Sequence, residues 1–167
     1  SSRALKGNKA FTDKEIKYVN KRKKDKKLRT VFNDLGRVRI IQFIKDERNR
    51  SLRLEDCRKA GDAIAAILNR EILVSAVVID VDGKRDETLA LVEGIYLGNY
   101  QFLKYQTKAE EKQNTLDAIG IKSNVITEED ITEVNIVTRA VTEARTLVNE
   151  PLSWLTAPQL SKELERM

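Results

Sequence analysis

Two groups of acidic residues have the types and spacing that could support metal-dependent chemistry in this 167-residue chain. Asp80 and Asp82 follow a long apolar run, and Glu128, Glu129 and Asp130 stand together before a helical pattern. A two-metal hydrolase needs several converging carboxylates that hold ions about 3.5–4 Å apart. The first pair, however, ends a predicted strand beside a turn, and carboxylates at a helix start are stabilised by the helix dipole. Both groups are therefore interpreted as structural.

Other side chains narrow the chemistry further. The sequence contains no histidine and a single cysteine, Cys57. This composition excludes Ser-His-Asp and Cys-His triads, histidine-ligated zinc sites, cysteine metal clusters and an internal disulfide. A lone cysteine in an apolar helix is usually a small hydrophobic residue. Any catalysis by this chain would have to use carboxylates, lysine or tyrosine.

A basic run is the candidate binding site. Residues 21–29, KRKKDKKLR, contain seven basic residues, and the chain carries a formal net charge of +5. Such a run can attract the phosphates of nucleic acids. No aromatic residue is interleaved with the lysines, and a solvated helix face is the commoner meaning of such a run. The candidate patch consists of Lys21, Arg22, Lys23, Lys24, Lys26, Lys27 and Arg29.

The first half of the chain predicts a helix, a hairpin and a second helix. Thr12 and Glu15 have the capping-box spacing, so a short basic helix is expected to begin there. Residues 28–44 contain two strand-like runs around the turn residues 33–36, as in a β-hairpin. Residues 55–71 then show helical apolar spacing.

The middle of the chain predicts a buried strand followed by a long helix. Residues 72–83 are almost continuously apolar, as expected of a strand that is covered on both faces. Residues 87–108 show a wide apolar helical face in which Gly94 and Gly98 predict a close backbone approach to a neighbouring element. Residues 105–122 read as a polar connection, and residues 123–127 as a short last strand.

Two helices are predicted at the end of the chain. Thr127 and Asp130 have capping-box spacing, and an amphipathic helix follows until Pro151 stops it. A second helix begins near Thr156, with an apolar stripe at Leu160, Leu164 and Met167 that requires a partner. Either the chain is truncated after this helix, or the helix packs back on the preceding domain. Trp154 is interpreted as a packing residue of the connection rather than a ligand-stacking one.

Two blocks of the sequence resemble the leucyl (cytosol) aminopeptidase family. The stretch VTEARTLVNEPLSW is similar to the Ala-Arg-x-Leu-Val-Asn-x-Pro junction between its two domains, through Ala144, Arg145, Leu147, Val148, Asn149 and Pro151. The stretch VEGIYLGNYQFLKYQ is similar to a helix of its N-terminal domain, through Glu93, Gly94, Leu97, Gly98, Tyr100, Phe102 and Tyr105. The resemblance extends over roughly residues 12–167.

The resemblance implies a two-domain metallopeptidase of which this chain holds the first part. Members have a macro-domain-like N-terminal domain and a catalytic domain with two divalent metals, Mn or Zn, and they are typically hexamers. The family's segments with the catalytic lysine and the metal ligands, of the Lys-Gly-x-x-Tyr-Asp-x-Gly-Gly and Asn-Thr-Asp-Ala-Glu-Gly-Arg types, do not occur here. No catalytic, metal or cofactor-binding residue is therefore assigned to this chain, which is expected to be inactive alone.

The alternation of strands and helices predicts an α/β fold, and the resemblance makes it a three-layer, macro-domain-like mixed sheet with helices on both faces. The expected divisions are a tail (1–12), an N-terminal domain (13–127), a linker helix (128–150) and the start of a catalytic domain (151–167). The absence of a long apolar run or signal peptide predicts a cytoplasmic protein without a membrane partner.

The expected role is non-catalytic. The chain would support homo-oligomer assembly and access to an active site in its own catalytic domain, where peptide substrates bind and lose N-terminal residues. Two alternatives remain open: a nucleic-acid-binding module, or a macro-like module that binds a nucleotide or ADP-ribose. Scattered glycines without a Gly-x-Gly or P-loop pattern count against the nucleotide alternative.

Overall fold

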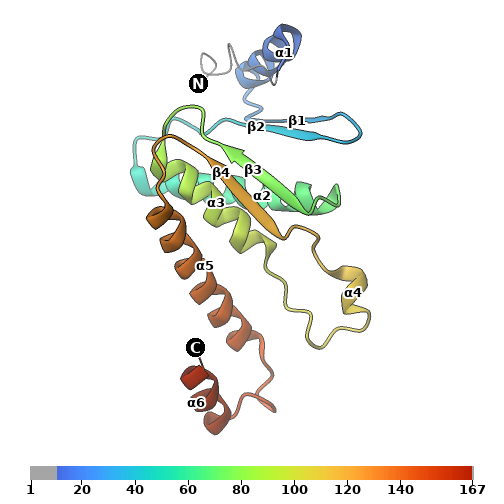
Figure 1. Cartoon of the computed structure of the whole chain (residues 1–167), viewed down its shortest axis with the longest axis vertical. Coiled ribbons are helices and arrows are strands. Elements are labelled where there is room, and N and C mark those ends of the chain that lie inside the picture. Colours follow the sequence, from blue (N-terminus) through green and yellow to red (C-terminus); the bar gives the residue numbers. More distant parts are fainter. Residues whose placement is uncertain (1–10, 167) are drawn as a thin grey trace.

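The computed structural model describes residues 11–166 and shows a mixed α/β protein, which confirms the predicted class (Figure 1). The helices are α1 (Asp13–Lys24), α2 (Arg50–Arg70), α3 (Arg85–Asn99), α4 (Ala109–Lys112), α5 (Glu128–Asn149) and α6 (Ala157–Arg166). The strands are β1 (Arg29–Asn33), β2 (Val38–Gln42), β3 (Ser75–Ile79) and β4 (Ala118–Lys122). The predicted tail lies almost entirely outside the described residues, as does Met167 of the last apolar stripe.

The described strands form two small sheets in place of the single mixed sheet that was predicted. The hairpin is confirmed, because β1 and β2 pair antiparallel with Asn33 opposite Val38. The side chain of Asn33 accepts a hydrogen bond from the Leu35 N–H within the turn. β3 and β4 pair in parallel, and the long connection between them contains α3 and α4.

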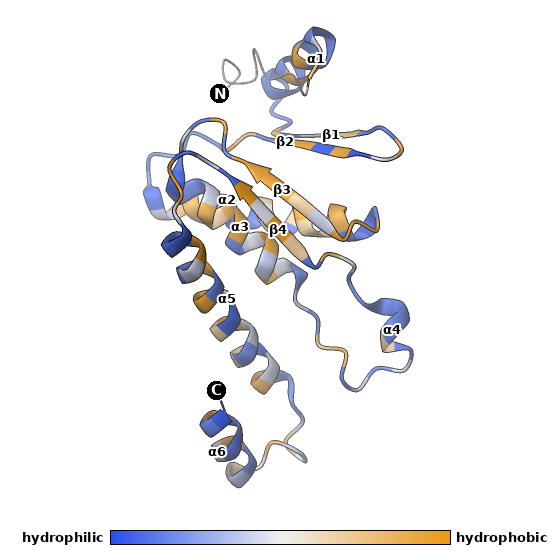
Figure 2. Ribbon diagram, viewed as in Figure 1, coloured by the Kyte–Doolittle hydropathy of each residue, from blue (hydrophilic) through white to orange (hydrophobic). Residues whose placement is uncertain are grey.

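The sheet of β3 and β4 is covered by α2 and α3 on one face. Ala76, Val78 and Ile119 pack against the main hydrophobic core on that side. On the other face, Val77 and Ile79 of β3 are 65% and 51% exposed. Figure 2 shows β3 as largely hydrophobic. The prediction that the strand is covered on both faces is therefore not met within residues 11–166.

Glycines bring α2 and α3 into backbone contact. A Cβ atom added at Gly61 of α2 or at Gly94 of α3 would lie well under 3.0 Å from backbone atoms of the other helix. At Gly98 it would meet Asp62 in the same way. The predicted close approach is confirmed, and α2 is its partner.

Two boundaries in the middle of the chain differ from the prediction. The expected helix over 87–108 ends at Asn99, whose side chain donates to the Leu116 carbonyl and accepts from Asn69. These bonds replace the next helical turn, and Tyr100 takes an extended conformation. The last strand is β4, not residues 123–127, because β4 pairs in parallel with β3 and places Ile119 and Ile121 on the same, more buried face.

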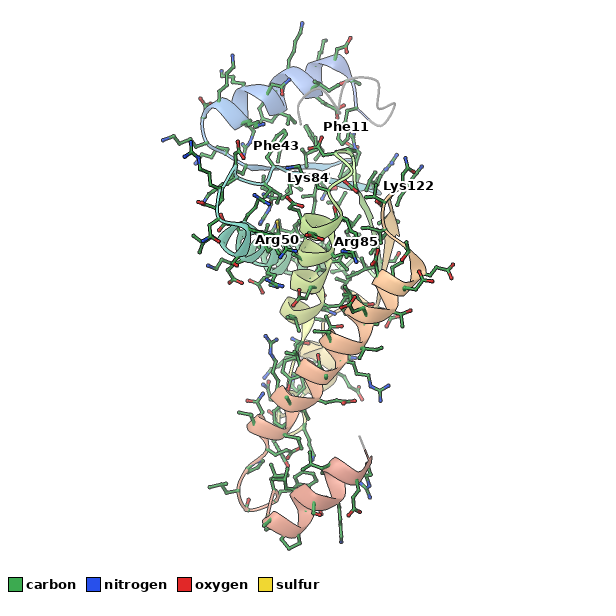
Figure 3. The ribbon with its side chains drawn as sticks, turned by 90° about the vertical axis from the view of Figure 1, so that its left-hand side faces the viewer. Phe11, Phe43, Arg50, Lys84, Arg85 and Lys122 are labelled. Carbon is green, nitrogen blue, oxygen red and sulfur yellow. The ribbon has the colours of Figure 1, made fainter. Side chains whose placement is uncertain are left out.

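A second, smaller core holds α1 against the hairpin. Ile16 and Val19 of α1 are buried with Ile41 and Phe43, and Phe11 packs beside them (Figure 3). The predicted capping box at Thr12 and Glu15 is present. The helix is therefore anchored to the hairpin by its apolar side and leaves its basic side to solvent.

α5 contacts α3, and α6 lies at the far end of the molecule from α1 (Figure 1). The capping box at Thr127 begins α5, which ends at Asn149 as predicted because Glu150 is extended before Pro151. No side chain of α6 is buried, and Leu164 is 57% exposed. Along residues 11–166, no helix is long and apolar enough to cross a membrane.

Candidate functional site: a polar clasp at the end of the long helix

The two sequence blocks singled out above meet in space. The hydroxyl of Tyr100, just after α3, lies 3.1 Å from the hydroxyl of Thr146 in α5. The same Tyr100 oxygen accepts a hydrogen bond from the Asn149 amide at 3.3 Å. Arg145 donates to the Leu97 carbonyl at 2.7 Å, and its guanidinium lies 5.8 Å from the Tyr100 ring centroid. The end of α3 is thus tied to the last two turns of α5.

A buried carboxylate lies at the centre of the contact. The Glu150 side chain is 3% exposed. It accepts hydrogen bonds from Lys104 Nζ and Tyr105 Oη, each at 2.6 Å. The same Lys104 ammonium lies 3.7 Å from the centroid of the Trp154 ring. We name these four residues, Lys104, Tyr105, Glu150 and Trp154, the polar clasp.

Local backbone constraints place the clasp residues. Pro151 excludes the helical conformation for Glu150, so α5 stops and the Glu150 side chain turns back toward the loop after α3. The Trp154 N–H donates to the Pro151 carbonyl at 2.9 Å, which folds the connection into a tight turn. On the other side, the Gln106 N–H donates to the Leu103 carbonyl and fixes the loop that carries Lys104 and Tyr105.

The charges of the clasp stabilise one another. Burial acts to raise the pKa of Glu150, but hydrogen bonds from Lys104 and Tyr105 outweigh it and lower that pKa. The hydrogen bond to Glu150 raises the pKa of Lys104, and it also raises that of Tyr105. All three groups therefore keep their neutral-pH protonation states, and the carboxylate is paired as a buried charge must be.

The acidic groups considered for chemistry have structural contacts. One carboxylate oxygen of Asp80 accepts hydrogen bonds from the backbone N–H groups of Asp82, Gly83 and Lys84. The loop before α3 therefore presents its N–H groups to its own aspartate, where a phosphate-binding loop would present them to a ligand. This arrangement counts against the nucleotide or ADP-ribose alternative.

The second acidic group fastens the start of α5. Asp130 completes the capping box with Thr127 and pairs with Arg85, which also contacts Asp86. Arg50 of α2 donates to the same Asp86 at 2.6 Å, and Figure 3 labels Arg50 and Arg85 near the start of α3. The Arg85 guanidinium, with the Thr127 backbone, lowers the pKa of Asp130 to about 2. The network joins α2, α3 and α5.

The structure divides the predicted basic patch into two sets. Arg22 donates to the Arg29 carbonyl, the Lys23 ammonium lies 4.6 Å from the Phe43 ring centroid, and Arg29 donates to the Ala60 carbonyl. These three side chains hold α1, the hairpin and α2 together. The remaining members are exposed to solvent: Lys21, Lys24, Lys26 and Lys27.

Comparisons with known proteins point to one family. The family model described as "Cytosol aminopeptidase family, N-terminal domain" matches residues 46–109. A probable cytosol aminopeptidase of Aquifex aeolicus (strain VF5) is 31% identical over 113 residues, which cover 66% of this chain and 22% of the relative. These matches support an N-terminal domain like that of the cytosol aminopeptidase family.

Two further comparisons agree with that family. A probable cytosol aminopeptidase of Clostridium perfringens (strain 13 / Type A) is 28% identical over 116 residues, covering 65% of this chain and 23% of the relative. The solved structure of a mutant of tomato leucine aminopeptidase has the same fold, with a TM-score of 0.69 and 20% identity. That alignment covers 83% of this chain and 28% of the tomato chain.

The chain therefore spans less than a quarter of the curated cytosol aminopeptidases it matches. Residues 11–166 contain no group of three or more potential ligands arranged to hold a metal ion. The acidic side chains present do not fit a two-metal centre, since Asp80 and Asp130 are bonded within the fold. No catalytic step is assigned to them.

The two blocks are visible in the sequence, but the clasp that their residues form is not. Lys104 and Glu150 are 46 positions apart, and neither side chain follows an apolar period. The available signal was that Pro151 directly follows Glu150, because a proline disfavours the helical conformation of the residue before it and so ends the helix at an acidic side chain. Trp154, interpreted as a packing residue, is 37% exposed and packs against the Lys104 ammonium.

Proposed function

We propose that this chain is the non-catalytic N-terminal part of a longer, leucyl-aminopeptidase-like enzyme that removes N-terminal residues from peptides. The match to the family's N-terminal domain and the short share of the relatives that the chain covers support this proposal. The observation that carries the proposal is the polar clasp. It uses the two family-like blocks to fix the direction in which the chain leaves the domain after Glu150.

In this proposal the domain divides as the sequence suggested. Residues 13–127 form the N-terminal domain, residues 128–150 the linker helix, and residues 151–167 the start of the catalytic domain. Since Glu150 is held by a loop of the first domain, the linker cannot swing without breaking the Glu150–Lys104 ion pair and the hydrogen bond from Tyr105. The clasp would thus hold the catalytic domain at a fixed orientation. A fixed orientation is needed if this domain is to influence access to the active site.

The remaining parts of the enzyme lie outside this chain in our proposal. Two divalent metals, Mn or Zn, would be held by the catalytic domain, which would also bind the peptide. The protein would assemble as a hexamer in the cytoplasm, with this domain contributing to assembly. The chain's own residues supply position and contacts, not reacting groups.

The proposal is tested by comparing this chain with the longer protein that contains it. With Mn²⁺ or Zn²⁺ present, we expect the longer protein to release leucine from a leucyl tripeptide and residues 1–167 alone to release none. Release by the isolated chain, or its absence from the metal-loaded longer protein, would contradict the assignment. Inductively coupled plasma spectrometry on both proteins checks separately which part retains the metal.

A further inference from the structure

A row of lysines covers the solvent side of α1. Their spacings of three, four and three residues place them on one face of a helix. The row consists of Lys14, Lys17, Lys21 and Lys24, all of them exposed. Ile16 and Val19, which anchor the helix, are buried on the opposite side. Figure 2 shows α1 as predominantly hydrophilic at one end of the molecule.

The positive charge of this row is not neutralised within the described structure. Among residues 11–166, none of the four lysines has an ion-pair partner. Of the two acidic residues in the first turn of α1, Asp13 and Glu15, Glu15 is engaged by Arg39 at 2.6 Å and by the Thr12 backbone. Like charges three or four residues apart destabilise a helix by about 0.2–0.5 kcal/mol per pair. The helix tolerates this repulsion because other contacts hold it.

Those contacts also make the row rigid. The capping box fixes the start of α1, and the buried Ile16 and Val19 fix its orientation on the hairpin. Near its end, Arg22 donates to the Arg29 carbonyl and Lys23 lies over Phe43. The lysine row is therefore presented on a firm support, with Lys26 and Lys27 continuing the positive charge beyond the helix.

We propose that this lysine row is a docking surface for the phosphate backbone of a nucleic acid. At 1.5 Å per residue, the row is about 15 Å long. Phosphates repeat about every 3.4 Å along one strand, so several can be neutralised at once. The ring of Tyr18, between Lys17 and Lys21, is 49% exposed, but it already packs against the Phe32 ring and the Arg22 guanidinium. The row therefore implies backbone binding without sequence preference. Insertion into a membrane is disfavoured because the apolar side of α1 is occupied by the hairpin.

The test uses residues 1–167 and a fluorescein-labelled 20-base-pair duplex, with binding followed by anisotropy between 50 and 200 mM KCl. Four phosphate contacts predict that log K falls with log salt with a slope of roughly −3.6. The row variant changes Lys14, Lys17, Lys21 and Lys24 to Gln. We expect it to bind at least tenfold more weakly at 50 mM KCl and to lose most of the slope.

A matched control changes four lysines elsewhere to Gln, so that the net charge falls equally. Three of these lie near acidic partners, and the fourth contacts an amide: Lys59, Lys84, Lys108 and Lys112. We expect this control to keep the slope within about one unit. Circular dichroism checks folding, and the pair Lys21→Gln and Lys24→Gln replaces the row variant if that variant unfolds.

Three results would overturn the proposal. They are undetectable duplex binding by the wild-type chain, equal losses in the row and control variants, and competition by poly-glutamate as effective as that by unlabelled duplex. The last result would identify an acidic protein as the partner chemistry. None of these outcomes bears on peptidase activity, so this inference and the proposed function can fail separately.

Discussion

The contact between α2 and α3 and the contact at the end of α5 are built in different ways. α2 and α3 touch through backbone atoms at Gly61 and Gly94, where a methyl group would have no room. The end of α5 is held by side chains, with Glu150 between Lys104 and Tyr105. The first contact depends on close packing and the second on charge and hydrogen bonding. The comparison indicates a rigid domain core and a junction that can be released separately.

The largest effect is expected from Gly94→Ala. Its new methyl group would meet the Arg58 backbone, and the two helices could accept it only by separating. Overpacking of a core costs about 1–3 kcal/mol, and contact with backbone places this change at the upper end. Urea unfolding followed by circular dichroism measures the loss. Gly36→Ala is the control, because a Cβ there meets nothing within 4 Å.

The Thr127→Ala change tests the attachment of the start of α5. It removes the acceptor for the Asp130 N–H, and loss of such a cap costs about 1 kcal/mol. Urea unfolding should show this decrease in the free energy of unfolding. The equivalent change Thr12→Ala removes the cap of α1, which packs on the smaller core. If Thr12→Ala destabilised the α2 and α3 pair as much as Thr127→Ala, the two cores would not be separate.

Lys104→Met is expected to open the clasp while it leaves the core folded. It removes the ammonium from both Glu150 and the Trp154 ring, so its effect should be local. Trp154 is the one tryptophan of the sequence, so its fluorescence reports on this site alone. We expect a shifted emission and a smaller loss of stability than for Gly94→Ala. Lys108→Met is the control, since that ammonium pairs with an exposed Glu111 instead.

The smallest effect is expected from acid. The pKa of Asp130 is lowered to about 2 by Arg85, and that of Glu15 is lowered to about 2 by the Thr12 backbone and Arg39. Because both carboxyls bind protons more weakly when folded, they stabilise the fold above pH 4. That stabilisation is lost as pH falls from about 4 to 2. Thermal unfolding at stepped pH measures it, and Asp130→Asn should flatten part of the decline.

Much of the local structure follows from the sequence because its causes are local. Thr12 and Thr127 cap helices by contacts three residues away, and Pro151 ends a helix by its own geometry. The paired glycines Gly94 and Gly98 correctly indicated a close helix contact.

The remaining differences depend on distant partners. The helix over 87–108 stops early because Asn99 bonds Asn69 and Leu116, which the apolar period around it does not reveal. The position of β4 depends on its register with β3. Glu150 and Lys104 meet only after both blocks fold. Sequence patterns located the blocks, and three-dimensional contacts were needed to show how they join.

Hydrogen exchange with mass spectrometry on the wild-type chain and Lys104→Met tests the central claim most directly. The claim is that the polar clasp holds the end of α5 independently of the α2 and α3 pair. It predicts that Lys104→Met speeds exchange in residues 146–160 and leaves exchange within α2 and α3 unchanged. Equal acceleration in both regions, or no change in residues 146–160, would contradict it.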